Sequence, residues 1–249
     1  MSVFTRRRFR LAAGAAAGAV GIEALWLEPR RVTVTRHRVG GGSRPLRVVQ
    51  LSDLHLQGIH QFEIDVASTV SNLTPDVIVL TGDSIDKRDR HGVLDEFLGA
   101  LPTQTPKYAV LGNWDYWSRA PVNELRAVYE RHHCRGADDL IGGNPDLGSL
   151  TPAASDETHV LLAHCPAYRE RVERRAAGRF TCMLSGHTHG GQIRFFGFAP
   201  VLPRGSGGYV SGWYRGPSRL PMYVSRGIGT SLVRARLGAP PEVSVFEIG

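Results

Sequence analysis

The sequence lacks the features that identify several common protein classes. Its 249 residues include only three cysteines, with no C-x-x-C spacing, which excludes a disulfide framework and a zinc knuckle. We expect Cys134, Cys165 and Cys182 to be small buried apolar residues. No repeat of fixed period and no long disordered tract is visible. The length suits one large α/β domain, with two small domains as the alternative.

Dense positive charge is also missing from most of the chain. The formal charge is +7, but residues 1–31 hold six arginines and two glutamates and contribute +4 of it. A nucleic-acid-binding domain usually shows denser clustering of basic residues than the remaining +3 provides. The charge pattern therefore argues against nucleic acid as a partner.

The N-terminal segment lacks a strongly apolar run. TRRRF, at residues 5–9, matches the twin-arginine export pattern, and the Ala/Gly-rich stretch after it is short and only mildly apolar for a membrane span. Glu23 interrupts this stretch, and no small-x-small cleavage site precedes Trp26. We interpret residues 1–31 as a twin-arginine signal or an N-terminal anchor of an exported protein, periplasmic or membrane-anchored. A disordered basic tail is the alternative.

Five short runs rich in Val, Ile and Leu each end in residues that can bind a metal ion. Continuous apolar runs of this length suit strands that are covered on both faces. Helix-like segments lie between the runs, at residues 60–73, 92–101, 119–133 and 166–178. The alternation predicts a largely parallel sheet, which would gather the polar residues at its carboxyl-terminal edge. The runs are LRVVQL before Asp53 and His55, VIVL before Asp83, YAVL before Asn113, HVLLA before His164, and CML before His187 and His189.

The character of the chain changes after residue 190. QIRFF, GYVSGWY, MYVS and VSVFEI are short β-like runs separated by Gly and Pro, and they predict a second, mostly antiparallel sheet. Tyr209, Trp213 and Tyr214 lie among glycines in this region. Such aromatic residues usually pack in a hairpin. As a minor hypothesis, Trp213 faces the metals and contacts a base or a lipid-linked sugar of the substrate.

The seven residues at the five strand ends combine three oxygen ligands with four imidazoles. This mixture suits Mn, Fe or Zn. Seven ligands are too many for one tetrahedral zinc, but they suit two ions that share a carboxylate. Two ions about 3.5–4 Å apart can generate hydroxide and bind a phosphate group. The predicted ligands are Asp53, His55, Asp83, Asn113, His164, His187 and His189.

Each group taken alone has a simpler interpretation. Asn113 could bond its own backbone in a turn, and Asp83 could cap a helix. His164 could be a buried histidine that the backbone satisfies. His187 and His189 are harder to dismiss, because imidazoles one residue apart point the same way only on an extended backbone. Independent accidents at five consecutive strand ends are improbable, which favours the metal site.

The blocks SDLH, TGD, GNWD, LLAHCP and SGHTHGGQ, in that order, resemble the calcineurin-like metallophosphoesterases over residues 45–249. The flanking segments resemble the bacterial exported or membrane-associated phosphodiesterase branch, which includes manganese-dependent enzymes and relatives that cleave a pyrophosphate. The resemblance implies a four-layer α/β/β/α sandwich. It also implies a dinuclear metal-dependent phosphohydrolase, a phosphodiesterase or pyrophosphatase with a metal-activated hydroxide as nucleophile. The substrate would be a small-molecule phosphodiester or a nucleotide-linked lipid, with a membrane surface as a further partner.

The same resemblance divides the seven ligands between two ions. It implies that Asp83 bridges the ions and that Asp83 and Asn113 belong to the catalytic machinery. One ion would be held by Asp53, His55 and His189, and the other by Asn113, His164 and His187.

Trp114 departs from the family pattern, which normally places a general-acid histidine after the asparagine. Indole has no titratable proton near neutral pH, and a general acid is typically worth about 10²–10⁴-fold in rate. Asp115, which would orient that histidine, has no apparent role. Three outcomes follow: the leaving group needs no acid, His60 or His91 replaces the histidine, or the domain is a catalytically weak metal- and phosphate-binding module. Trp114 itself would contact the substrate.

Overall fold

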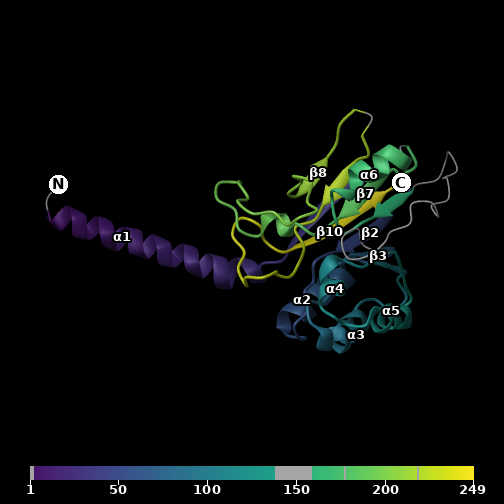
Figure 1. Ribbon diagram of the computed structural model, residues 1–249, viewed down its shortest axis with the longest axis horizontal. Helices are drawn as coiled ribbons and strands as arrows, with labels where there is room; N and C mark the ends of the chain where they lie inside the picture. Colours follow the sequence, from purple (N-terminus) through teal and green to yellow (C-terminus); the bar gives the residue numbers. More distant parts are fainter. Residues whose placement is uncertain (1–2, 138–158, 177, 218) are drawn as a thin grey trace.

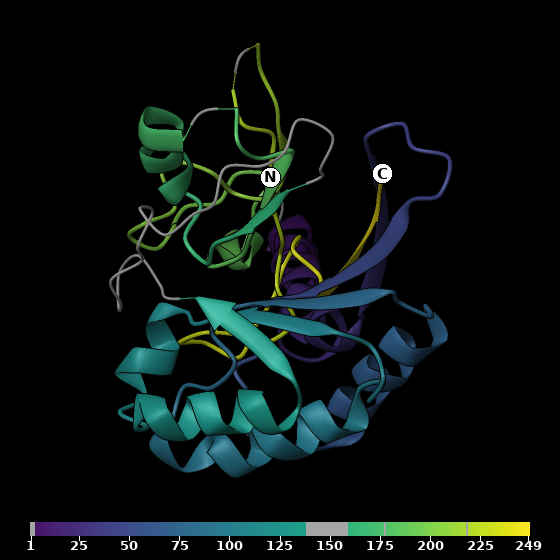
Figure 2. The ribbon, with the colours of Figure 1, turned by 90° about the vertical axis from the view of Figure 1, so that its right-hand side faces the viewer.

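Two β-sheets lie face to face, and each is covered by helix on its outer face (Figures 1 and 2). The computed structural model describes residues 3–137, 159–176, 178–217 and 219–249. In Figure 2 the layers follow one another from the helices at the bottom, through the two sheets, to the single helix at the upper left. The predicted four-layer α/β/β/α sandwich is confirmed.

The first sheet has six strands and contains only part of the predicted ligand-bearing set. Three strands that precede predicted ligands, β2, β3 and β4, pair in parallel, while β10 is antiparallel to β2. β1 pairs in parallel with β10, so the folded unit includes residues before 45. In spatial order the strands are β1 (Thr33–Val39), β10 (Glu242–Ile248), β2 (Leu46–Leu51), β3 (Val77–Thr81), β4 (Lys107–Val110) and β5 (Cys134–Ala137).

The second sheet corrects two expectations. The strands before His164 and His187 belong to this sheet, so the ligand-bearing strands are divided between two sheets rather than gathered in one. The sheet is also mostly parallel, because only β8 runs antiparallel to its neighbour. QIRFF forms isolated bridges rather than a strand, and VSVFEI belongs to the first sheet as β10. In spatial order, the strands of the second sheet are β6 (Val160–Leu162), β7 (Cys182–Ser185), β9 (Met222–Val224) and β8 (Gly212–Tyr214).

The four predicted helices are confirmed, and they form the two outer layers. Three of them pack on the first sheet, and the fourth packs on the second. They are α2 (Gln61–Asn72), α3 (His91–Ala100) and α5 (Val122–Arg131) on the first sheet, and α6 (Tyr168–Ala176) on the second. Short helical segments connect other elements: α4 (Asn113–Trp117), η3 (Arg88–Arg90) and η4 (His189–Gly191).

The buried strands show why the ligand-bearing runs are apolar throughout. Successive side chains of a strand point to opposite faces, so a strand covered on both faces needs apolar residues at every position. In β3, Ile78 and Leu80 pack toward the helices, whereas Val79 packs between the sheets. In β7, Leu184 packs between the sheets and Met183 packs toward α6.

The N-terminal segment forms a helix that projects from the body of the protein (Figure 1). It consists of α1 (Val3–Ile22), the π-helical turn η1 (Glu23–Leu27) and the 3₁₀ turn η2 (Glu28–Arg30). The stretch Arg8–Arg30 has the length and apolar composition of a membrane span, which the sequence alone led us to doubt. A signal sequence near the N-terminus has the same properties, so an anchor and a signal both fit.

We expect Leu184→Ala to destabilise the protein by about 2–5 kcal/mol, because it opens a cavity between the sheets where Leu184 is fully buried. Leu46→Ala is the control: its side chain is 56% exposed, and we expect a change within about 0.5 kcal/mol. Urea unfolding followed by circular dichroism measures both. Equal destabilisation by the two variants would show that the inter-sheet layer is not the core described above.

Candidate metal centre

The seven predicted ligands meet where the carboxyl-terminal ends of the two sheets come together. β2, β3 and β4 deliver the ligands of the first sheet, and β6 and β7 deliver those of the second. None of the seven residues is more than 5% exposed. Their convergence was the central expectation from the sequence, although their role as ligands stays a prediction.

One set of donor atoms surrounds His164. Its Nε2 atom lies 3.2 Å from Asp83 Oδ2, 3.2 Å from Asn113 Oδ1 and 3.1 Å from His187 Nδ1. Ligands that bind one ion at about 2.1 Å are spaced by about 3 Å from one another. These four atoms therefore have the spacing of ligands around a single cation.

A second set of donor atoms lies on the other side of Asp83. His55 Nε2 and His189 Nε2 are 3.2 Å apart, and His189 Nε2 is 3.7 Å from Asp53 Oδ1. Asp83 Oδ2 lies 3.7 Å from His55 Nε2, so the same oxygen faces both sets. An oxygen in this position can bridge two ions.

Hydrogen bonds from one ring nitrogen orient two of the histidines so that the other ring nitrogen faces the cluster. His164 donates from Nδ1 to Thr81 O at 2.8 Å, and His187 donates from Nε2 to Arg204 O at 2.8 Å. Such partners fix the tautomer and orient the ring of a metal ligand. Burial lowers the pKa of His55, and lowers that of His189 further, so both rings are neutral at neutral pH. Neutral imidazole is the form that binds metal.

The carboxylates bring negative charge into this buried region. Burial raises the pKa of Asp53 to about 6, although the Ser52 hydroxyl and the backbone N–H of His187 donate to its oxygens. Burial also acts to raise the pKa of Asp83, but His164, His55 and the backbone N–H of Trp114 together outweigh it, and the net pKa is lowered. Buried carboxylates beside neutral imidazoles require a compensating cation. The two buried carboxylates and the neutral histidines therefore fit divalent cations.

The ligands lie on a strained backbone. A left-handed conformation in a residue other than glycine costs about 1–3 kcal/mol and is concentrated at functional sites. His187 and His189 have φ values of 75° and 50°, so the expectation that they lie on extended backbone is wrong. They face different sets of donor atoms instead. The ligands with positive φ are Asp53, His55, Asp83, His187 and His189.

Asp115 has a structural role that the sequence analysis missed. Its Oδ2 accepts from Gly112 N at 2.8 Å and from Asp83 N at 3.0 Å, while its Oδ1 accepts from Ser84 N at 3.0 Å and Ile85 N at 3.2 Å. Burial and the nearby Asp83 raise its pKa to about 7, and the N–H donors oppose that shift. Position 112 requires glycine, because a Cβ there would overlap the Asp83 carboxylate. The sequence did indicate this role, because Asp115 is an acidic residue at the third position (N3) of a helix that begins after Gly112.

Trp114 lies against His55, a member of the second set of donor atoms. Its ring is half-buried, with its centroid 5.9 Å from that of His55 and 5.7 Å from that of Trp117, both edge to face. Its backbone N–H donates to Asp83 Oδ1 at 2.7 Å. The indole rings of Trp114 and Trp117 thus line this side of the site, and Trp114 occupies the position where the family pattern has a histidine.

The other residues considered for substrate contact or acid catalysis lie elsewhere. Trp213 packs between the sheets, with ring centroids 5.4 Å from Tyr223 and 6.0 Å from Phe246, which is the packing role that the sequence also allowed. His60 precedes α2, and His91 Nδ1 lies 3.3 Å from the carbonyl of Arg88. Among the described residues, no hydrogen bond, ion pair or ring contact joins His60 or His91 to the seven ligands.

All three cysteines are buried thiols without a disulfide, as expected. Cys165 has an additional feature that the sequence did not indicate. Its sulfur and the ring nitrogens of His164 and His187 form a group whose atoms lie within 4.8 Å of one another. The thiol therefore lies beside the set of donor atoms around His164.

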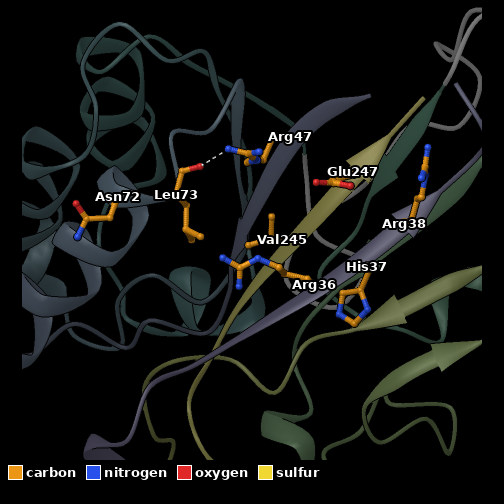
Figure 3. Close-up of a pocket in the computed structure, with 8 residues that line it drawn as sticks. All are labelled: Arg36, His37, Arg38, Arg47, Asn72, Leu73, Val245 and Glu247. Atoms are coloured by element: carbon orange, nitrogen blue, oxygen red, sulfur yellow. Dashed lines mark hydrogen bonds between the residues drawn. The ribbon is translucent and has the colours of Figure 1, made fainter. Parts of the chain in front are cut away.

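A cavity of about 330 Å³ lies away from these ligands (Figure 3). Arg36 and Arg38 of β1, Arg47 of β2 and Glu247 of β10 line it, and none of the seven ligands does. Arg47 donates to the carbonyl of Leu73, as the dashed line in Figure 3 shows.

Comparison with known proteins gives a consistent assignment. Residues 46–191 match the sequence profile of a family described as calcineurin-like phosphoesterase, and this range contains all seven ligands. Metallophosphoesterase YkuE of Bacillus subtilis is 31% identical and covers 100% of this chain and 99% of its own. Phosphodiesterase YaeI of Escherichia coli is 29% identical, with coverages of 99% and 100%. A Bos taurus transmembrane protein with a metallophosphoesterase domain is 28% identical, with coverages of 86% and 55%.

We expect Asp115→Asn to lower the affinity for Mn²⁺ by about 10–100-fold, the usual effect of losing a partner that orients a metal ligand. The new amide N–H₂ group would meet backbone N–H donors that now bond to a carboxylate oxygen, and the loop carrying Asp83 would shift. Isothermal titration of metal-free protein with Mn²⁺ measures the effect. Asp95→Asn on the surface of α3 is the control, and equal affinities in all three proteins would contradict the role given to Asp115.

Proposed function

Because the chain belongs to the calcineurin-like phosphoesterase family, we propose that it is a dinuclear metal-dependent phosphohydrolase, either a phosphodiesterase or a pyrophosphatase. The observation that carries the proposal is the position of Asp83, whose Oδ2 atom lies between two separate sets of ligand atoms. The name of the relative YaeI supports a phosphodiester as the substrate class. Mn, Fe or Zn suits the mixed oxygen and nitrogen donors.

The side chains have distinct roles in this proposal. Two divalent ions, when bound, supply a hydroxide nucleophile at neutral pH and the positive charge that binds the phosphoester. Asp83 would contact both ions, while Asn113 would contribute a neutral oxygen that limits the negative charge of the site. Asp53 is held by Ser52 and by the backbone of His187, so its oxygens keep a fixed direction. Such preorganisation avoids rearrangement during the reaction.

Trp114 restricts the leaving group. Its indole N–H cannot supply a proton near neutral pH, and the described contacts bring neither His60 nor His91 to the site. We therefore infer a preference for phosphoesters whose leaving group departs without a proton, such as a nucleotide phosphate released from a pyrophosphate. The same feature favours the second candidate function, a metal- and phosphate-binding module with little turnover.

The N-terminal segment supports a membrane-anchored location outside the cytoplasm. In this part of the proposal, residues 1–31 form a twin-arginine signal that is retained as an anchor, and the phosphoesterase domain lies on the extracytoplasmic side. Glu28 is buried and accepts hydrogen bonds from Gly238 N at 2.9 Å and Ala239 N at 2.5 Å. Cleavage after Glu28 would leave these N–H groups without their partner, at about 1–3 kcal/mol for each group that stays buried. Retention of the segment avoids this cost.

Hydrolysis of bis-p-nitrophenyl phosphate by the Mn²⁺-loaded full chain separates the two candidate functions. We expect turnover, and we expect Asp83→Ala to reduce kcat/KM by more than about 100-fold, because even an outer partner of a ligand is worth about 10–100-fold. Asp95→Ala, which removes a carboxylate at the surface of α3, is the matched control. Tight Mn²⁺ binding without turnover would instead identify the binding module.

The Trp114→His variant tests the restriction on the leaving group. A histidine at this position can protonate the departing oxygen, so an alkyl phosphodiester should gain more than an aryl one, up to about 100-fold, at the lower end of what general acids contribute. The measurement is kcat/KM for both esters in the variant and in the original protein, with Trp117→His as the control. Equal gains for the two esters, or no gain, would reject the idea.

A further inference from the structure

Two loops beside the metal centre carry large apolar side chains in an exposed position. Residues 195–201 and 232–233 form what we call the apolar rim. Phe196 is fully exposed at 110% and Leu232 is 91% exposed. Exposed apolar groups that occur together, rather than singly, mark interaction sites. The other exposed apolar members are Phe195, Phe198, Val201 and Val233.

Hydrogen bonds join the two loops into one surface. The side chain of Gln192 donates to Ser231 O at 3.1 Å and to Val233 O at 2.8 Å, and it accepts from Ser231 N at 3.0 Å. The backbone of Arg194 donates to Leu237 O at 2.7 Å, and Leu237 N donates to Gln192 O at 2.9 Å. The rim is therefore a defined part of the fold.

The same loops are bonded to the metal centre. Gly229, just before the second loop, donates to Asp53 O at 2.7 Å, and Ile228 donates to Ser52 O at 3.0 Å. In the first loop, Arg194 Nε donates to the carbonyl of Gly190, the residue after the ligand His189. The two loops are thus bonded directly to the chain segments that carry Asp53 and His189.

The N-terminal helical segment meets the domain on this side as well. Arg236 N donates to Ala24 O at 2.8 Å. Gly238 and Ala239, which follow Arg236 in the sequence, donate from their backbone N–H groups to the carboxylate of Glu28. Leu25, at 52% exposed, and its neighbours in η1 present apolar groups at the junction. In Figure 1 the yellow-green loop and the yellow loop lie on the side from which α1 projects.

We propose that the apolar rim docks on the surface of a lipid bilayer, beside the point where α1 leaves the membrane. The stretch Arg8–Arg30 has the length and apolar composition of a membrane span, and its C-terminal part is bonded to the domain through Ala24. Four arginines, Arg6, Arg7, Arg8 and Arg10, lie at the end of α1 that is remote from the domain, and two, Arg30 and Arg31, lie at the domain end. The excess of positive charge therefore has the direction that the positive-inside rule favours. A bilayer that accommodates α1 must therefore pass close to the rim.

Charge at the rim also suits a lipid surface. Arg204 and Arg234, in or next to the two loops, are exposed, and anionic headgroups attract cations near a membrane. Apolar side chains flanked by arginine are the composition of segments that lie in the interface. If the domain is the phosphoesterase proposed above, docking of the rim favours phosphoesters whose alcohol is part of a membrane lipid. Only this statement about the substrate rests on the proposed function.

Spin labels on the full chain in nanodiscs of phosphatidylcholine and phosphatidylglycerol test the docking without any need for turnover. Because the native cysteines are buried, Phe196→Cys and Leu232→Cys each give a single reactive thiol. We expect both labels to be more accessible to oxygen than to a water-soluble nickel chelate, at about 5–10 Å below the headgroups. Glu96→Cys, an exposed position on α3, is the control and should show the reverse preference.

A domain merely tethered by α1 would leave all three labels equally accessible to nickel, and that result would overturn the proposal. Labels at 196 and 232 that are immobilised but protected from both reagents would point to a protein partner and would overturn it equally. Circular dichroism of each labelled variant confirms folding before the comparison. Loss of phosphodiesterase activity would not alter these readouts, so the docking and the enzymatic function fail separately.

Discussion

The site depends on one constraint: the Asp83 carboxylate must face ligands from two sheets at once. Its Oδ2 atom lies 3.2 Å from His164 of the second sheet and 3.7 Å from His55 of the first. These distances require the carboxyl-terminal ends of the two sheets to stay next to each other. Buried polar bonds hold them there, from His164 to Thr81 O and from Gln50 to Ser185 O. The apolar layer between the sheets supports this alignment.

The sequence predicted which residues gather at the candidate site, and it predicted the helices, because both are local patterns. An apolar run followed directly by Asp, Asn or His indicates a buried strand and the group at its end, and helical spacing indicates the segments between. All seven ligands came from such positions, and the structure brings them together. The four-layer fold needed the resemblance as well, since periodicity alone does not reveal how many sheets the strands form.

The features that were not predicted depend on contacts between distant residues. β3 and β7 are both covered on two faces, so their apolar runs look alike although they belong to different sheets. β10 joins the first sheet by pairing with β2 and β1, and neither partner is marked in its sequence. The left-handed backbone of His187 and His189 is imposed by the loop rather than by residue type. Asp115 bonds to a loop about 30 residues away, so only its helix-capping position was visible.

Trp114 and the apolar rim restrict the proposed substrate from two directions. In the proposed function, an indole beside His55 stands where the family has a proton donor, so the leaving group would depart as a stable anion. Gly229, next to the rim, is bonded to Asp53, so the docking proposed above would bring a lipid surface to the side of the fold that carries this residue. A soluble alkyl ester meets neither condition. A phosphoester with a lipid on one side and an acidic phosphate as its leaving group meets both, which gives the missing histidine and the exposed phenylalanines a common explanation.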